Sequence, residues 1–337
     1  MIYNQLGNTD MKISNYSLGA SAFGSVYSET DDQECVELLK TALKRGVNLI
    51  DTSPWYGHGK AETVLGKILP QLDRSSCYIN TKVGRYEKDI SGMFDFSYER
   101  TIKSVDESLK RMNIDYIDVI QVHDFEFAPN LEIIVNETLP ALQKVKEQGK
   151  ARYIGITAYP IDVLKSLIQK SKVKIDSILS YCHGSMNDNS LQDHMAFFES
   201  QGIGVINASG LSMGLLTDRG PAKWHPAGVK IREACKNAAV YCQERGSNIS
   251  RLALYFSISQ PKIASTLYST SKLAKLEANL DVVENGITDE EKQLMGEVVE
   301  RFFDPLESKS WEGVEVESYW KKLKKASEGG SQDFEYA

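Results

Sequence analysis

Residues 98–122, with the sequence YERTIKSVDESLKRMNIDYIDVIQV, contain the repeating unit that decides the fold. In the first part the hydrophobic residues recur at alternating spacings of four and three, which predicts an amphipathic helix. These residues are Tyr98, Ile102, Val105, Leu109 and Met112. The second part, Tyr116–Val122, is a short run rich in β-branched residues, which is typical of a buried strand. A helix followed by such a strand is the building unit of a parallel α/β sheet.

The same alternation of short apolar runs and longer amphipathic stretches extends along nearly the whole chain. We predict eight strands, at Tyr16–Ala20, Val47–Asp51, Cys77–Thr81, Tyr116–Val122, Arg152–Ile156, Ile175–Leu179, Ile203–Ala208 and Ile263–Leu267. Gly46, Gly149 and Gly202 each come just before a strand, where the preceding helix is expected to end. Continuous apolar strands separated by helices indicate a parallel sheet covered on both faces. Eight repeats favour an α/β fold of the closed (β/α)8 TIM-barrel type over an open doubly wound sheet.

Three segments depart from the repeat. Two short runs, Ile2–Leu6 and Met11–Ser14, predict an N-terminal β-hairpin within residues 1–14 that closes the bottom of the barrel. The loop 215–226 follows the seventh strand, so we expect it to lie over the catalytic face. Residues 325–337 are predicted to form a frayed tail. The whole chain, 1–337, is then expected to be a single barrel domain.

Composition excludes several classes of protein. The 337 residues carry 39 Lys and Arg against 46 Asp and Glu, and this net charge of −7 argues against nucleic acid or anionic lipid as a partner. No stretch approaches the ~20 apolar residues of a membrane span. The first residues do not resemble a signal peptide, and the five cysteines form no CxxC pair. We therefore expect free thiols and a cytoplasmic location. The sequence does not indicate an oligomeric state.

Polar residues lie at the predicted C-terminal ends of consecutive strands, where a TIM barrel carries its chemistry. Asp51 ends the second strand and Tyr56 comes five residues later, while Lys82 follows the third strand and His123 the fourth. A phenol has a pKa near ~10, and a neighbouring ammonium lowers it by stabilising the phenolate. A carboxylate would hold that ammonium charged, and a histidine could donate a hydrogen bond to a substrate carbonyl. The four residues therefore form a candidate proton-transfer and hydride-transfer site.

Each of these residues also has a structural interpretation when it is taken alone. An aspartate at a strand end often caps a helix, and Tyr56 could be a rim aromatic. Lys82 could be a solvated charge, and His123 could bridge backbone groups. Their shared position on one face of the barrel favours the catalytic interpretation.

Three longer motifs resemble those of the aldo-keto reductases. They are GVNLIDTSPWYG at 46–57, IDYIDVIQVH at 114–123 and GKARYIGI at 149–156, and the resemblance extends from about Leu6 to about Leu280. The resemblance implies that Tyr56 is the proton donor, that Asp51 and Lys82 tune it, and that His123 orients the substrate carbonyl. It also implies a nicotinamide dinucleotide, NAD or NADP, bound without a Rossmann domain. In agreement, the chain lacks GxGxxG, since GASAFG at 19–24 has the wrong spacing.

At the positions implied to contact the cofactor, the chain departs from the family's usual residues more often than at the catalytic positions. The implied contacts are Ala20, Thr157, Ser180, Ser209, Gly210, Leu211, Ser269, Ser271, Lys275 and Asn279. Thr157 and Ser180 stand where the family usually has a serine and a glutamine, and Ala278 replaces an acid. Lys275 takes the place of a basic or polar residue that many NADP-using relatives have, so we expect both dinucleotides to be accepted.

Within the family, the chain most resembles the L-galactose dehydrogenases, which oxidise an aldose at C1 to the aldonolactone. This likeness rests on residues 51–57, on SYCH at 180–183, on Asn187 and Asp188, and on the 214–227 loop. We expect Trp55, Tyr86 and Trp224 to form an aromatic wall against a sugar or aldehyde substrate.

Three other functions stay open from the sequence. One is a general aldehyde or ketone reductase, and another is a non-catalytic cofactor-binding regulatory subunit. The third is a metal-dependent barrel enzyme using His58, His123 and His183, although no HxH or HxxxH pair is present and no metal is expected. Cys182 beside His183 is expected to be a packed thiol, because adjacent strand residues point to opposite faces.

Overall fold

The computed structural model describes residues 1–26 and 28–328. Within these ranges, eight parallel strands close into a barrel, because β10 pairs with both β9 and β3. The strands are β3 (Tyr16–Gly19), β4 (Leu49–Asp51), β5 (Tyr78–Val83), β6 (Ile117–His123), β7 (Ala151–Thr157), β8 (Ser177–Tyr181), β9 (Gly204–Ala208) and β10 (Ser265–Ser269). This closed order confirms the predicted (β/α)8 TIM barrel.

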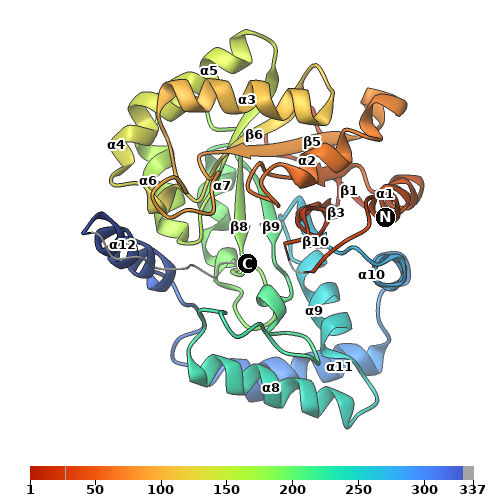
Figure 1. Cartoon of the computed structure of the whole chain (residues 1–337). Coiled ribbons are helices and arrows are strands. Elements are labelled where there is room, and N and C mark those ends of the chain that lie inside the picture. Colours follow the sequence, from red (N-terminus) through yellow and green to blue (C-terminus); the bar gives the residue numbers. More distant parts are fainter. Residues whose placement is uncertain (27, 329–337) are drawn as a thin grey trace.

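Helices surround the strands, with α3 and α5 along the top of Figure 1 and α8 and α11 along the bottom. The helices are α1 (Asp32–Lys44), α2 (Lys60–Leu65), α3 (Tyr98–Met112), α4 (Leu131–Ile133), α5 (Leu139–Glu147), α6 (Ile161–Lys170), α7 (Met195–Ser200), α8 (Val229–Gln243), α9 (Ile249–Ile258), α10 (Leu273–Asn285), α11 (Asp289–Val298) and α12 (Val314–Ser327). The main core lies between their apolar faces and the outward side chains of the barrel.

Two strands extend further toward the catalytic face than the sequence predicts. Lys82 lies within β5 and His123 is the last residue of β6, whereas both were expected just after their strands. The ladder continues there because Lys82 is paired in register with Gln121, and His123 with Thr157. A charged side chain does not end a strand when its charge is satisfied inside the barrel.

The predicted hairpin closes the bottom of the barrel. It consists of β1 (Tyr3–Gln5) and β2 (Lys12–Ser14), which pair antiparallel. Leu6, Met11 and Ile13 are fully buried and form one cluster with inward side chains from five barrel strands. Those side chains are Leu49, Val119, Leu179, Ile206 and Leu267. The apolar layer supports the barrel at the end opposite the predicted chemistry.

The C-terminal segment returns to the barrel and ends in α12, seen at the left of Figure 1. Tyr319 of α12 packs edge-on against Phe94 and Phe127, with ring centroids 5.2 and 5.5 Å apart. The tail predicted from residue 325 is helical as far as Ser327, and residues 329–337 of that prediction lie outside the described ranges.

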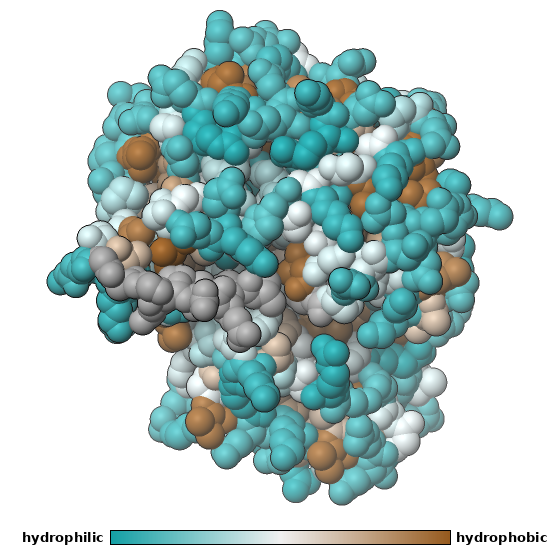
Figure 2. Space-filling model, in the orientation of Figure 1, coloured by the Kyte–Doolittle hydropathy of each residue, from teal (hydrophilic) through white to brown (hydrophobic). Residues whose placement is uncertain are grey.

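The visible face of the protein is mostly hydrophilic, with hydrophobic residues scattered singly over it (Figure 2). Such scattering is ordinary for a protein surface. No helix in the described part of the chain is long and apolar enough to span a bilayer.

We predict that Met11→Ala lowers the free energy of unfolding by about 2–5 kcal/mol, because it leaves a cavity in the layer beneath the barrel. Urea unfolding measures the change. Ile2→Ala, which alters a residue 62% exposed on the same hairpin, should change stability by less than about 0.5 kcal/mol. Equal unfolding midpoints for the two variants would show that the hairpin does not support the barrel.

Candidate active site

A buried ion pair joins the ends of two neighbouring strands. The ammonium of Lys82 lies 2.7 and 2.8 Å from the two carboxylate oxygens of Asp51, and it also donates to the carbonyl of Thr52 at 2.8 Å. Asn80 donates its side-chain amide to the same carboxylate at 2.6 Å. Burial raises the pKa of Asp51, whereas Lys82 and Asn80 oppose that rise. The lysine therefore has a fixed position and a compensated charge.

Tyr56 is held next to this pair by a tight turn after β4. Its hydroxyl lies 3.5 Å from the ammonium of Lys82. The turn packs against the backbone that follows β3: a Cβ atom added to Gly57, which has φ +63°, would lie 2.1 Å from the carbonyl oxygen of Gly24. A side chain at position 57 would therefore force the turn, and Tyr56 with it, away from Lys82.

His123 completes the group from β6. Its ring meets that of Tyr56 edge-on, with centroids 6.2 Å apart. Its Nδ1 lies 3.2 Å from Oγ of Ser53, and its Nε2 lies 3.5 Å from a carboxylate oxygen of Asp124. Burial lowers the pKa of His123 to about 3, against the opposing effect of Asp124. The imidazole is therefore neutral near pH 7 and can donate one hydrogen bond.

The structure thus brings all four predicted catalytic residues together at the C-terminal end of the barrel. Beneath them, Gln121 is fully buried, and neither its side-chain oxygen nor its side-chain nitrogen has a hydrogen-bond partner among the described residues. Buried polar groups are normally paired. A polar ligand or a water molecule in the barrel mouth would satisfy this amide.

Most of the predicted cofactor residues lie along an arc formed by the ends of β7, β9, β10 and β3. Thr157 ends β7 and lies in register with His123. Ser209 has φ +58° and begins the turn that contains Gly210 and Leu211. The hydroxyl of Ser269 accepts a hydrogen bond from the backbone N–H of Ala22 at 2.9 Å, and Ala20 donates its backbone N–H to the backbone carbonyl of Asp51 at 2.7 Å.

The outer part of this arc is polar and accessible. Ser269 and Lys275 are exposed, and Ser271 is partly exposed. Asn279 donates to the hydroxyl of Tyr16 at 3.2 Å, and Tyr16 stacks on Tyr268. Hydroxyl and ammonium donors suit phosphate groups, so these residues fit a dinucleotide.

Two predictions need correction. Leu179 packs inside the barrel and Tyr181 stacks on Tyr159 at the mouth, so Ser180 between them points toward the helices and away from the cofactor arc. Tyr86 is only 5% exposed: its hydroxyl accepts the backbone N–H of Gly84 at 2.8 Å, and Arg100 of α3 covers its ring at 3.7 Å. It therefore stabilises a loop and does not form part of a wall facing substrate.

The two predicted tryptophans lie in separate clusters. Trp55 is buried and packs with Ile90, Met93 and Tyr319, with the guanidinium of Arg85 4.1 Å above its ring. Trp224 is 39% exposed and stacks on His225, with ring centroids 6.4 Å apart.

The sequence prediction missed a wall of side chains beside His123. Tyr159 stacks between Tyr181 and Trp311, with centroids 5.0 and 5.2 Å away. Arg85 and Asp124, which form an ion pair at 2.7 Å, lie after β5 and β6, so the strand-end argument could have found them. Trp311 comes from the C-terminal segment, which no strand-end pattern indicates.

The buried side chain of His183 pairs with two carboxylates, that of Asp188, which is buried, and that of Glu312, which is exposed. Its Nδ1 lies 2.9 Å from Asp188, and its Nε2 lies 3.1 Å from Glu312 as an ion pair without hydrogen-bond alignment. Burial opposes protonation of His183, but its hydrogen bond to Asp188 and the charges of Asp188 and Glu312 raise the pKa of His183 to about 9.

Cys182 is buried, as predicted for a packed thiol. Among the described residues, no three His, Cys, Asp or Glu side chains have an arrangement that could hold a metal ion.

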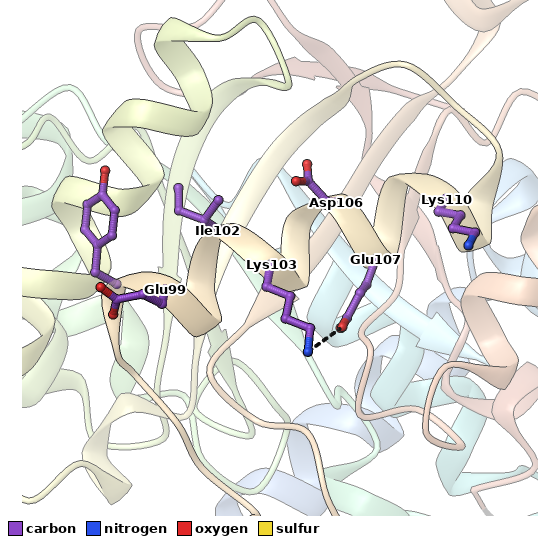
Figure 3. Close-up of a pocket in the computed structure, with 7 residues that line it drawn as sticks. Glu99, Ile102, Lys103, Asp106, Glu107 and Lys110 are labelled. Atoms are coloured by element: carbon purple, nitrogen blue, oxygen red, sulfur yellow. Dashed lines mark ion pairs between the residues drawn. The ribbon is translucent and has the colours of Figure 1, made fainter.

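A separate hollow on the outside of the barrel carries no comparable chemistry. All of its lining residues belong to α3, and its charged side chains include the ion pair between Lys103 and Glu107 (Figure 3). The barrel mouth is therefore the better candidate for catalysis.

Comparison with known proteins agrees with this site. A profile of the Aldo/keto reductase family matches residues 16–300. The chain belongs to the aldo/keto reductase family. It is 41% identical to the L-galactose dehydrogenase of Arabidopsis thaliana over 91% of this chain and 95% of that protein. It is 30% identical to the D-arabinose 1-dehydrogenase of Saccharomyces cerevisiae over 89% and 93% of the two chains.

A solved structure agrees in fold. The aldo-keto reductase AKR11C1 from Bacillus halodurans, in its holo form, superposes with a TM-score of 0.73 and 26% identity, covering 88% of this chain and 96% of that one. The protein is thus an NAD(P)-dependent oxidoreductase of this family.

We predict that His183 makes stability depend on pH in the alkaline range. A pKa raised from about 6.5 to about 9 contributes stability that is present below pH 6.5 and is lost as the pH rises through 9. The unfolding free energy should fall by roughly 2 kcal/mol more in the wild type than in His183→Gln between pH 7 and 9.5. Urea unfolding at both pH values measures this difference, and parallel pH dependences would contradict the assignment.

Proposed function

We propose that this aldo/keto reductase oxidises an aldose at C1 to the aldonolactone and transfers hydride to a nicotinamide dinucleotide. The observation that carries the proposal is the buried Lys82 ammonium, held 2.7 Å from Asp51 and 3.5 Å from the Tyr56 hydroxyl. Support for an aldose comes from the two relatives, whose names describe dehydrogenases of L-galactose and D-arabinose.

Tyr56 is proposed to act as the general base in the oxidative direction. The ammonium of Lys82 stabilises the phenolate, and Asp51 keeps that ammonium in place. Tyr56 then takes the proton of the C1 hydroxyl as the C1–H bond breaks and the C1 carbonyl of the lactone forms. The ring oxygen of the sugar stays bonded to C1 throughout.

His123 is proposed to orient the C1 oxygen. Ser53 lies next to Nδ1, and the carboxylate of Asp124 lies next to Nε2, which favours the tautomer with the proton on Nε2. That N–H can donate to the oxygen as carbonyl character develops. A bound oxidised nicotinamide would supply the hydride acceptor, with the arc around Thr157, Gly210 and Ser269 holding the dinucleotide.

We expect that Tyr56→Phe will reduce kcat for aldose oxidation by about 10²–10⁴-fold, because it removes only the proton-transferring oxygen. Cofactor affinity, measured by fluorescence titration, should stay unchanged. Tyr98→Phe, on the outside of the barrel, is the matched control and should retain wild-type turnover. Wild-type turnover by Tyr56→Phe would exclude Tyr56 as the base, and a wild-type enzyme inactive on every aldose tested would exclude sugar oxidation.

Lys275 is proposed to contact the 2′-phosphate of NADP. The side chain is exposed near the start of α10 and lies in the same arc as Ser269. A charge-assisted hydrogen bond is worth ~1.5–3 kcal/mol, roughly 10- to 150-fold in affinity. Lys275→Gln should weaken NADPH binding by that factor and leave NADH binding unchanged, whereas Lys292→Gln on α11 should change neither. Parallel losses for both cofactors would remove Lys275 from the 2′-phosphate site.

A further inference from the structure

Glu62 is a fully buried carboxylate close to Tyr56 in the sequence, and the proposed mechanism gives it no part. It lies on α2, beside α3 and β5 in Figure 1. One carboxylate oxygen accepts the hydroxyl of Thr81 at 2.6 Å, and the other accepts Nε–H of Arg111 at 2.7 Å. A buried carboxylate is costly unless it is paired and hydrogen-bonded in this way. Glu62 therefore joins α2 to strand β5 and to helix α3 at once.

Thr81 connects Glu62 to the end of the strand that carries the catalytic lysine. Side chains alternate along β5, so Thr81 faces the helices together with Ile79 and Val83, which lie in the main core. Lys82, the next residue, faces the barrel interior. Glu62 is thus bonded to the neighbour of Lys82 from the outer side of the barrel wall.

The backbone of the turn that carries Tyr56 continues directly into α2. The N–H of Ala61 donates to the carbonyl of Tyr56 at 3.2 Å, and the N–H of Lys60 donates to the carbonyl of Gly57 at 3.1 Å. Helix α2 has only six residues, and helices of this length are not stable alone in water. The position of the turn therefore depends on the contacts that α2 makes with the rest of the protein.

Arg111 of α3 approaches α2 closely at both ends of that helix. A Cβ atom added at Gly59, just before α2, would lie 2.8 Å from Cδ of Arg111. One added at Gly66, just after α2, would lie 2.1 Å from the carbonyl oxygen of Arg111. Between the two glycines, the guanidinium of Arg111 pairs with the carboxylate of Glu62. Close packing at the ends and an ion pair in the middle fix α2 on α3.

We propose that Glu62 is a positioning residue for the catalytic tyrosine. Its carboxylate bonds to Thr81 and Arg111 together, and so holds α2 at a fixed distance from β5. This keeps the hydroxyl of Tyr56 3.5 Å from the ammonium of Lys82. The proposal rests on the proposed role of Tyr56 as the general base. Because the attraction between an ammonium and a phenolate falls with distance, a displaced α2 would leave a phenol that keeps its proton to higher pH.

The test measures kcat for aldose oxidation against pH in Glu62→Met, which keeps a side chain of similar size but removes both bonds. At pH 7, kcat should fall by about tenfold, and the ascending limb of the profile should move up by about one pH unit. The cofactor Kd, from fluorescence titration, should change less than about threefold. The variant leaves in place the charged and titratable groups around Tyr56, namely Lys82, Asp51, His123 and, beyond His123, Asp124 and Arg85.

Two further variants separate positioning from a general loss of stability. Glu62→Gln can still accept both hydrogen bonds, so it should restore kcat at pH 7 to within about threefold of the wild type. Asp118→Asn is the matched control, because Asp118 is also a buried carboxylate, 2.8 Å from Arg152, but lies near the start of β6 at the hairpin end of the barrel. It should lower the melting temperature and leave the pH profile of kcat unchanged.

A folded Glu62→Met enzyme with the wild-type profile would overturn the proposal, and so would an equal shift of the profile in Asp118→Asn. If Glu62→Met does not fold, it is combined with Thr81→Val, because an apolar pair leaves no buried hydroxyl unpaired. If the wild type oxidises no aldose, the proposed aldose oxidation fails, and the same variants are compared in the reduction of propanal. Tyr56 then acts as the acid, and the descending limb should move up by the same amount.

Crystal structures of the wild type and the variant give a readout that does not depend on turnover. The hydroxyl of Tyr56 should lie at least about 1 Å farther from the ammonium of Lys82 in Glu62→Met than in the wild type. An unchanged separation would overturn the proposal, whatever substrate the enzyme uses.

Discussion

A lysine ammonium removed from water at the end of a barrel strand remains charged only when a carboxylate and further acceptors replace its hydration. Lys82 has both, in Asp51 and the carbonyl of Thr52. The pair joins β4 to β5 and presents a fixed positive charge to the hydroxyl of Tyr56. The proposed proton transfer depends on this arrangement, as does the position of the turn that carries Tyr56.

The two ends of the barrel differ in what they contribute: the end closed by the hairpin is apolar and stabilises the fold, and the opposite end carries the candidate catalytic residues. The N-terminal hairpin fills the bottom with Leu6, Met11 and Ile13, while the opposite end holds polar groups that are fully buried or only partly satisfied. The side-chain amide of Gln121 and the indole Nε1 of Trp311 are buried polar groups without a hydrogen-bond partner among the described residues. The apolar layer at the bottom buries hydrophobic surface and so stabilises the folded barrel, which the polar groups at the mouth do not. The strand ends at the mouth can therefore carry polar groups for chemistry.

Sequence periodicity predicted the barrel, the hairpin and the position of the four catalytic residues, because each depends on local spacing and on strand order. The sequence pattern placed Lys82 just after its strand, because a charged residue usually ends a buried strand. The ion pair with Asp51 that satisfies its charge is a tertiary contact, which the local pattern does not contain. Ser180 was misassigned because a shift of one residue along a strand reverses the face that its side chain meets. Trp311 could not be found, because its packing on Tyr159 is a tertiary contact made by the C-terminal segment, which no strand-end pattern indicates.

Transfer of the C1 hydrogen of an aldose is the most direct test of the proposed reaction. The aldose would be deuterated at C1 and incubated with the protein and oxidised cofactor, and the reduced nicotinamide would be analysed by NMR or mass spectrometry. We predict one deuterium at C4 of the reduced nicotinamide for each lactone formed. A reduced cofactor without deuterium, or lactone formed without cofactor reduction, would contradict hydride transfer from C1.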